Sequence, residues 1–340
     1  MAIYEVSAKR KFNSGVVKFE PGMSIRIHTD MVSSSIWTQA RYRRAMAEAF
    51  VSQYGLSCPV EKFEQQINNV NFDYILISKQ MYTYDKNQEI LEKWTTRAAE
   101  MGDGDIYQDG VYYKGDRYPI DNGKLERDCG GEDEQWNKAC RRILFISKDP
   151  NESGNPYDMR CCELTHNADG SLAFGGRFVK NMLRITAGLA TISAEGYLPW
   201  DKVNDVTFCD KVWNETAVAR INLKKNDGGA SIDTAVLASF AEKYKDLIVS
   251  QIKLHDANII VCCGGSSYIK NFVVDNIYND AEKLNNWIYY SQSKNVWIID
   301  SYHMNPRSAT TDEALYNDIM SNFNEALKVK NISTPERWKT

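Results

Sequence analysis

From about residue 140 onward, four short apolar segments constrain the fold more than any other feature of the chain. Long amphipathic stretches such as "GGRFVKNMLRITAGLA" separate them. Short, nearly continuous apolar strands that alternate with helices indicate a parallel sheet covered on both faces. We therefore predict an α/β domain at 136–335, with three α/β/α layers around a central, mainly parallel sheet. The predicted strands are "RILFIS" (142–147), "TAVARINL" (216–223), "ANIIVCCG" (257–264) and "NVWIIDSY" (295–302).

The N-terminal residues 1–80 have the pattern of a separate, small α+β accessory module. "IYEVSAKRKF" and "VVKFEPGMSIRIHT" alternate as strands do, with a turn at 13–15 between them. A helical pattern that ends at Gly55 follows, and "NFDYILIS" is typical of a closing strand. This part resembles a small family of uncharacterised proteins from bacterial mobile elements, which implies no activity. We predict that residues 81–135 form a linker helix and a hairpin.

The overall charge argues against a generic polyanion binder. The chain has 41 Lys and Arg against 45 Asp and Glu, a net charge of −4, which still permits a local basic groove. No apolar run approaches the roughly 18 residues of a membrane helix, and "MAIYEVSAKRKF" lacks the apolar core of a signal peptide. We expect a cytoplasmic protein with no membrane partner.

The eight cysteines fit the same expectation. None of them has the C-x₂-C spacing of a zinc or iron–sulfur site, and "VCC" at 261–263 is typical of a core strand, where cysteine behaves as a small hydrophobe. We predict no metal and no cofactor. The cysteines stand at positions 58, 129, 140, 161, 162, 209, 262 and 263.

Polar residues follow each of the four predicted strands. Asp149 comes after the first strand, Asn222 ends the second, a glycine pair at 264–265 follows the third, and His303 follows the fourth. Ligands of parallel α/β sheets bind outside the carboxyl ends of the strands. The sequence therefore predicts one candidate site at this edge.

The order of these segments resembles the uracil-DNA glycosylase superfamily. "ISKDPNES" is similar to its first motif, a strand followed by a catalytic Asp or Asn before Pro. "DSYHMNPRS" is similar to its last motif, with Met-Asn-Pro where Pro-Ser is usual. "INLKK" looks like the middle motif, "DANIIVCCGG" like the strand before the last, and "SLAFGGRF" carries the aromatic that would stack on an extruded base. The resemblance covers about 140–330 and implies a DNA glycosylase fold, with DNA as the partner.

The resemblance assigns roles to particular residues. Asp149 and His303 would be catalytic, and segments between 151 and 214 would select the base. The substrate-binding residues would be Lys148, Pro150, Asn151, Phe174, Asn222 and Asn305. The DNA phosphate-binding residues would be Lys224, Lys225, Gly264, Gly265, Ser266, Ser267 and Arg307.

The chemistry of these side chains is suited to cleavage of an N-glycosidic bond. A carboxylate near the sugar can orient a water molecule and offset the developing positive charge. A histidine can donate a hydrogen bond to the leaving base, and an asparagine offers a donor and an acceptor to the edge of a flipped base. We expect a glycosylase that acts on a modified or damaged base in DNA, with removal of modified bases from phage DNA as one possible use.

Other interpretations of the same residues stay open. Asp149 could cap the turn or helix that follows, and Asn222 could satisfy a backbone turn. His166 and His255 are expected to be structural, and "RYRR" at 41–44 a solvated helix face that is also the best second basic patch. At the level of function, the altered "HMNP" permits an inactive nucleic-acid-binding or sensing module. A hydrolase of free nucleosides or nucleotides is the third possibility.

Overall fold

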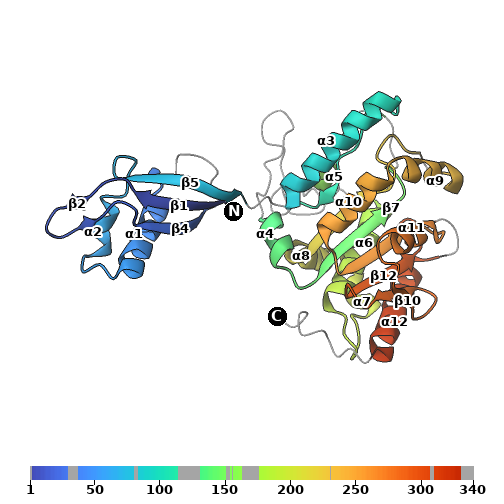
Figure 1. The fold of residues 1–340 in the computed structure, drawn as a ribbon. Coiled ribbons are helices and arrows are strands. Elements are labelled where there is room, and N and C mark those ends of the chain that lie inside the picture. The colour runs from blue at the N-terminus through green and yellow to red at the C-terminus, as the bar shows by residue number, and fades with distance from the viewer. Residues whose placement is uncertain are drawn as a thin grey trace. The chain divides into compact units, whose positions relative to one another are not determined.

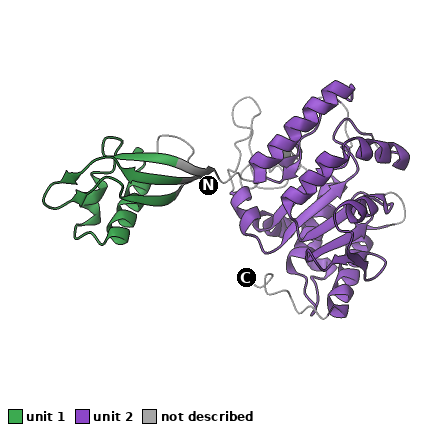
Figure 2. Ribbon diagram, viewed as in Figure 1, with its two compact units in different colours: residues 1–82 green, residues 83–340 purple. Residues whose placement is uncertain are grey.

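The computed structural model of the chain divides into two compact units, residues 1–82 and residues 83–340, which Figure 2 shows in different colours. We call them the first unit and the second unit. The structure describes residues 2–29, 37–79, 83–113, 131–150, 154, 156–162, 176–229, 231–306 and 310–330.

The first unit is built on a three-stranded antiparallel sheet. β1 (Ala2–Ala8) lies between β4 (Ser24–Thr29) and β5 (Phe72–Lys79). One face of this sheet packs on α1 (Ala40–Tyr54), where Met46 and Phe50 are fully buried. The predicted second strand is divided by the Pro21-Gly22 turn, where Gly22 has a φ of +85°. The other elements are the hairpin strands β2 (Phe12–Asn13) and β3 (Lys18–Phe19) and the helix α2 (Val60–Glu64).

The second unit is built on a seven-stranded mixed sheet of order β10-β11-β12-β9-β7-β8-β6 (Figure 1). Its four central strands are parallel, and both edges are antiparallel. The central strands match the four predicted apolar segments. The strands are β6 (Gly110–Val111), β7 (Arg142–Ser147), β8 (Ala217–Asn222), β9 (Ile259–Cys263), β10 (Ala281–Lys283), β11 (Ile288–Ser291) and β12 (Val296–Ser301).

Helices cover both faces of this sheet because side chains alternate along each strand. On β7, Ile143 and Phe145 belong to one buried cluster, and Leu144 and Ile146 to the other. The first cluster includes helices α6 (Arg177–Thr191), α7 (Trp200–Val203), α8 (Val206–Glu215) and α12 (Asp312–Val329). The second includes α3 (Thr83–Met101), α4 (Glu132–Lys138), α9 (Thr234–Lys243), α10 (Lys245–His255) and α11 (Tyr268–Asn276).

This arrangement confirms the predicted α/β class, a largely parallel sheet flanked by helices together with a small N-terminal module. Polar caps mark several helix starts, as at α8, where the Asp205 carboxylate accepts from the N–H groups of Thr207 and Phe208. In the part of the chain that the structure describes, no helix combines the length and the apolar character needed to cross a membrane.

The predicted linker at 81–135 needs correction. Its described residues belong to the second unit, since Leu91 and Trp94 of α3 are buried in the core against α10 and β6 adds a short strand to the sheet. The predicted linker helix is therefore α3, and its apolar side faces the core of the second unit. Residues 114–130, which contain much of the expected hairpin, lie outside the described residues.

Candidate functional site

The parallel strands β8, β7, β9 and β12 end at the same edge of the sheet. Their order in the chain is β7, β8, β9, β12, so the strand order reverses between β7 and β9. The connection from β7 to β8 covers one face with α6 and α8, and the connection from β8 to β9 covers the other with α9 and α10. Open α/β sheets bind ligands in the crevice at such a reversal. Asp149 and the glycine pair at 264–265 stand on either side of it.

Asp149 lies two residues beyond the end of β7 and is half-buried. Burial raises the pKa of its carboxyl group, while the Lys224 ammonium and a hydrogen bond from the Gly229 N–H oppose that rise. The donor comes from the loop after β8. The described contacts of Asp149 therefore point across the sheet edge, as a carboxylate held for a ligand would.

The loop after β8 packs directly on the Asp149 backbone. A Cβ on Gly228 would lie 1.5 Å from the Pro150 carbonyl oxygen and 2.6 Å from Oδ2 of Asp149, so only glycine fits there. Gly229 is not crowded in this way, because the nearest atom to its Cβ would be 4.0 Å away. Gly228 was not predicted to belong to the site. The Gly-Gly step shortly after a strand end was the available signal.

His303 is partly buried in the loop after β12. The backbone N–H of Asn305 donates to its Nδ1 at 3.1 Å, a shorter contact than the 3.3 Å from Nδ1 to the Asn305 carbonyl oxygen. With Nδ1 as the acceptor of this N–H, the ring proton lies on Nε2. Gly265 packs beside this loop, since a Cβ there would lie 3.7 Å from the backbone nitrogen of His303. The third and fourth strand-end loops are thus in contact.

Arg220 and Phe178 extend the site between Asp149 and His303. The Arg220 guanidinium lies 4.4 Å from the Phe178 ring centre, and the Phe178 and His303 rings are 5.3 Å apart. Arg220 is buried in β8, contacts Ser147 through Nε at 3.3 Å, and lowers the pKa of Asp149 electrostatically. Neither residue was predicted from the sequence. An arginine inside the apolar strand "AVARIN" was the signal, because a charge is placed there only with partners.

Asn222 is buried at the end of β8, on the same sheet face as Arg220. Its Nδ2 contacts the Met159 sulfur at 3.2 Å, and its Oδ1 has no hydrogen-bond partner among the described residues. Its backbone N–H donates to Asp109 at 2.8 Å and not to a local turn. The side-chain oxygen of Asn222 is the kind of buried acceptor that a bound ligand would satisfy.

Lys225 cannot reach a phosphate from its position in this structure, which corrects its predicted role. Its side chain is completely buried, and its ammonium group lies 2.6 Å from Oδ1 of Asp109. Gln251 donates to the same carboxylate at 2.8 Å, and the Trp94 ring lies 4.8 Å from the ammonium. "INLKK" therefore supplies the cation of a buried ion pair that fixes the chain just after β8. The sequence could not show this, because Asp109 is remote in the chain.

The other predicted phosphate contacts differ in their availability. The Lys224 ammonium is half-buried and donates to the carbonyl oxygens of Asn226 and Asp227. The N–H groups of Gly264 and Gly265 already donate to Cys262 and Ser301. In the described part of the chain, the N–H groups of the last two loop residues, Ser266 and Ser267, have no such backbone partner.

The remaining predicted residues fall into two groups. Lys148 is partly buried, Pro150 is buried and Asn305 is exposed at the same sheet edge. Asn151, Phe174 and Arg307, together with His166, lie outside the described residues. His255, predicted to be structural, is completely buried and contacts the Gln251 carbonyl oxygen at 2.7 Å.

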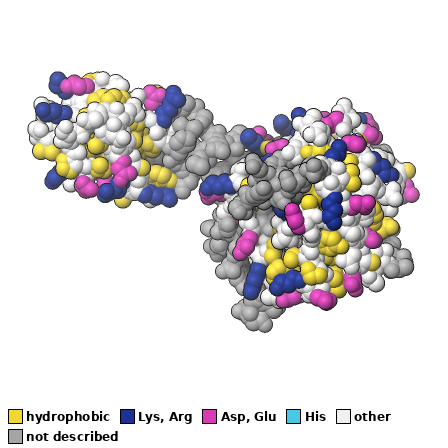
Figure 3. All heavy atoms as spheres, turned by 90° about the horizontal axis from the view of Figure 1, so that it is seen from below, with side chains coloured by type: hydrophobic (Ala, Val, Ile, Leu, Met, Phe, Trp, Pro, Cys, Tyr) yellow, Lys and Arg dark blue, Asp and Glu magenta, His cyan; other side chains and the backbone are white. Residues whose placement is uncertain are grey.

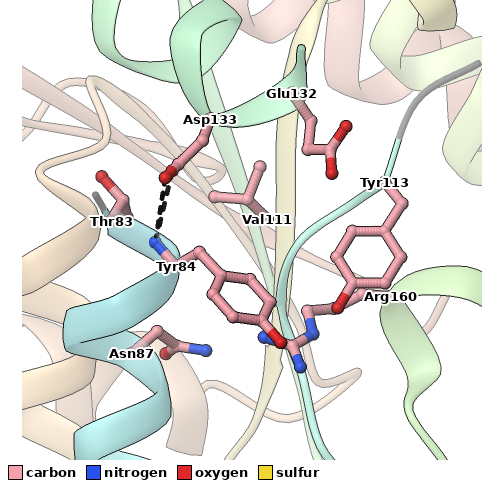
Figure 4. A pocket seen from close by; sticks show the side chains of 8 residues that line it. All are labelled: Thr83, Tyr84, Asn87, Val111, Tyr113, Glu132, Asp133 and Arg160. Atoms are coloured by element: carbon pink, nitrogen blue, oxygen red, sulfur yellow. Dashed lines mark hydrogen bonds between the residues drawn. The ribbon is translucent and has the colours of Figure 1, made fainter. Parts of the chain in front are cut away.

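A separate small cavity lies between α3, α4 and α5 (Met159–Cys162) (Figure 4). The Arg160 guanidinium lies 4.7 Å from the Tyr84 ring centre and 5.4 Å from that of Tyr113, and Asp158 binds it at 2.6 Å. The cavity volume of about 10 Å³ has room for about one water molecule. It is too small for a nucleobase, and its charged groups serve the packing of the unit.

The described residues contain no group of three or more His, Cys, Asp or Glu side chains that could hold a metal ion. Cys262 and Cys263 are completely buried in β9, as expected of core cysteines. On the face drawn in Figure 3, the basic and acidic side chains of the described residues are interspersed and form no broad patch of one sign. Contact with a polyanion on that face would have to be local.

Comparison with known proteins informs only the first unit. A family of unknown function (DUF6140) matches residues 1–74, which agrees with the expected resemblance of this part to an uncharacterised family. No curated protein matches the chain. The family match brings no activity, and it ends before the α/β fold of the second unit begins.

Proposed function

We propose that the second unit is a DNA glycosylase that hydrolyses the N-glycosidic bond of a modified or damaged base. The observation that carries the proposal is the grouping of Asp149, Arg220, Phe178 and His303 at one sheet edge, beside the strand reversal. An acid, a hydrogen-bond donor and a nearby buried cation are groups suited to this reaction. The similarity to the uracil-DNA glycosylase superfamily, noted above from the motifs, adds to this support.

The reaction would proceed with a separate task for each side chain. Water attacks C1′ of the sugar while the bond from C1′ to the base nitrogen breaks, and the base leaves with the electron pair. Asp149 orients this water, offsets the positive charge on the sugar and accepts the water proton. His303 donates from Nε2 to the base oxygen on which negative charge collects. Each interaction strengthens as the bond breaks, and such interactions raise the rate.

Three further residues act on this pair, and a fourth would face the base. Arg220 and Lys224 favour the ionised form of Asp149 against the effect of burial. Phe178 packs between Arg220 and His303 and so restricts the imidazole ring. Asn222 offers its unbonded Oδ1 to an amino group on the edge of a flipped base. Together these residues would hold the catalytic pair and the base at one edge of the sheet.

The experiment uses a panel of DNA substrates and detects abasic sites by alkaline cleavage. The DNAs carry uracil, hydroxymethylcytosine, glucosylated hydroxymethylcytosine or an alkylated base, and the matching free nucleosides form a second arm. Release from at least one DNA, lost in His303→Ala, supports a glycosylase. Release from nucleosides alone indicates a hydrolase of small molecules, and DNA binding without release indicates an inactive binding module.

A further inference from the structure

A second pocket lies at the same sheet edge, at the ends of β9 and β12 and apart from Asp149. It has a cavity volume of about 210 Å³ and is open to solvent. Pockets for drug-sized ligands start at about 300 Å³, so this one suits a smaller group. Nothing in the reaction described above uses it. The residues that matter here are Ser266, Ser267, Asn286, Trp287, Asp300 and Tyr302.

Two aromatic side chains form one wall of this pocket. The rings of Trp287 and Tyr302 are 5.2 Å apart and perpendicular, with an interplanar angle of 87°. Tyr302 is 44% exposed, which makes it the most exposed of the large aromatic side chains among the described residues. Tyrosine exposed beside a second aromatic in a concave site is typical of a surface on which an unpaired base stacks.

The polar side of the pocket favours a base over a phosphate. The Asp300 carboxylate lies on this side, and its Oδ2 accepts a hydrogen bond from the Ser267 hydroxyl at 2.8 Å. An anion at this position would repel a phosphate. The Ser266 Oγ is buried and has no hydrogen-bond partner among the described residues, while the Asn286 amide is exposed. Carboxylate, hydroxyl and amide together can accept from, and donate to, the edge of an amino-bearing base.

We propose that this pocket is a second subsite, which binds an unpaired adenine, cytosine or guanine base of a nucleotide near the target. The inference rests on the proposed function in one respect, since it takes DNA as the ligand. It changes the expected role of the loop at 264–267 from phosphate contact to base contact. A site that needs an unpaired base beside the target also predicts a preference for single-stranded or locally opened DNA.

The test uses the full chain and a single-stranded DNA of about 15 nucleotides, long enough for one binding site, with 2-aminopurine at its centre. Its matching duplex is the comparison ligand. Tyr302→Ala removes the exposed ring, and Tyr302→Phe is the matched control that keeps it. Binding is followed by anisotropy of an end label, stacking by 2-aminopurine fluorescence, and free adenosine is titrated in a second arm.

We expect Tyr302→Ala to weaken single-strand binding about tenfold, since one stacked base contributes on this scale. The 2-aminopurine signal should be quenched by the wild type and by Tyr302→Phe, and much less by Tyr302→Ala. The salt slope should not change, because no charge is removed. The duplex should bind more weakly than the single strand.

The outcomes separate this inference from the proposed function. Equal affinity and equal quenching in all three proteins would overturn the second subsite, and base release from the substrate panel would be unaffected by that result. A wild type that binds neither the oligonucleotide nor adenosine overturns it as well. If single-strand binding depends on the Tyr302 ring but no DNA in the panel loses a base, the second subsite stands and the glycosylase proposal fails.

Discussion

Replacing Lys225 with methionine tests whether this residue serves the core or a DNA phosphate. Methionine has nearly the same length and no charge, so the substitution removes the ammonium group with little change in packing. The Asp109 carboxylate would stay 1% exposed, and it would still accept from the Asn222 N–H and the Gln251 amide, each at 2.8 Å. An anion would thus be left in the core without its countercharge.

Breaking a buried ion pair on one side costs about 3–5 kcal/mol, because the remaining charge is uncompensated. For a domain of this size each kcal/mol lowers Tm by about 2–4 °C, so Lys225→Met should lower the melting temperature by about 10 °C. Adding Asp109→Asn removes the stranded charge and keeps an acceptor for the Asn222 N–H. The double variant should therefore be more stable than Lys225→Met alone.

Urea unfolding of the full chain at neutral pH measures these differences, with the exposed Lys211→Met as the control. DNA affinity is measured in parallel at several salt concentrations. The reasoning is refuted if Lys225→Met is as stable as Lys211→Met and lowers the salt slope of DNA binding by about one charge, since a phosphate contact gives that pattern.

Two further predictions concern pH and the loop over Asp149. Burial lowers the pKa of His255 to about 4, below its unfolded value of about 6.5, so its stabilisation is present above pH 6.5 and declines as the pH falls toward 4. About 2 kcal/mol should be lost between pH 7 and pH 5, and His255→Gln should remove this part of the pH dependence of urea unfolding. Gly228→Ala should slow base release at least about tenfold, because its Cβ would displace Asp149 or Pro150. Gly229→Ala, where there is room, should keep nearly full activity, and equal rates in the two variants would disprove the close fit.

The class of the second unit could be predicted from sequence because its central strands are buried on both faces. Such strands are continuous apolar runs, and the four runs from "RILFIS" to "NVWIIDSY" became β7, β8, β9 and β12. The edge strands β10 and β11 were not predicted. Both are short; β10 is mostly exposed and pairs only with β11, while β11 is mostly buried and pairs with β12 across a turn in which Asn295 has a φ of +53°.

The site was only partly predictable for a related reason. Asp149 and His303 stand at strand ends, which a parallel sheet brings to one edge whatever the details of packing. Arg220 and Phe178 join them through contacts across the sheet face, and Lys225 is taken into the core by Asp109, 116 residues away in the chain. No local sequence pattern shows such long-range partners. Lys224 and Lys225 were therefore both predicted to contact phosphate, although Lys225 is buried against Asp109.

Single-turnover base release by Asp149→Ala tests the central claim most directly. The substrate is the DNA that the wild type cleaves best in the panel, and Asp201→Ala, which removes an exposed carboxylate on α7, is the control. Loss of the positioned carboxylate should slow release about 10²-fold or more. DNA binding should stay equal or become tighter, since an anion near the backbone is removed. Release by Asp149→Ala at the rate of the wild type and of Asp201→Ala would contradict the account, because Asp149 would then have no part in breaking the glycosidic bond.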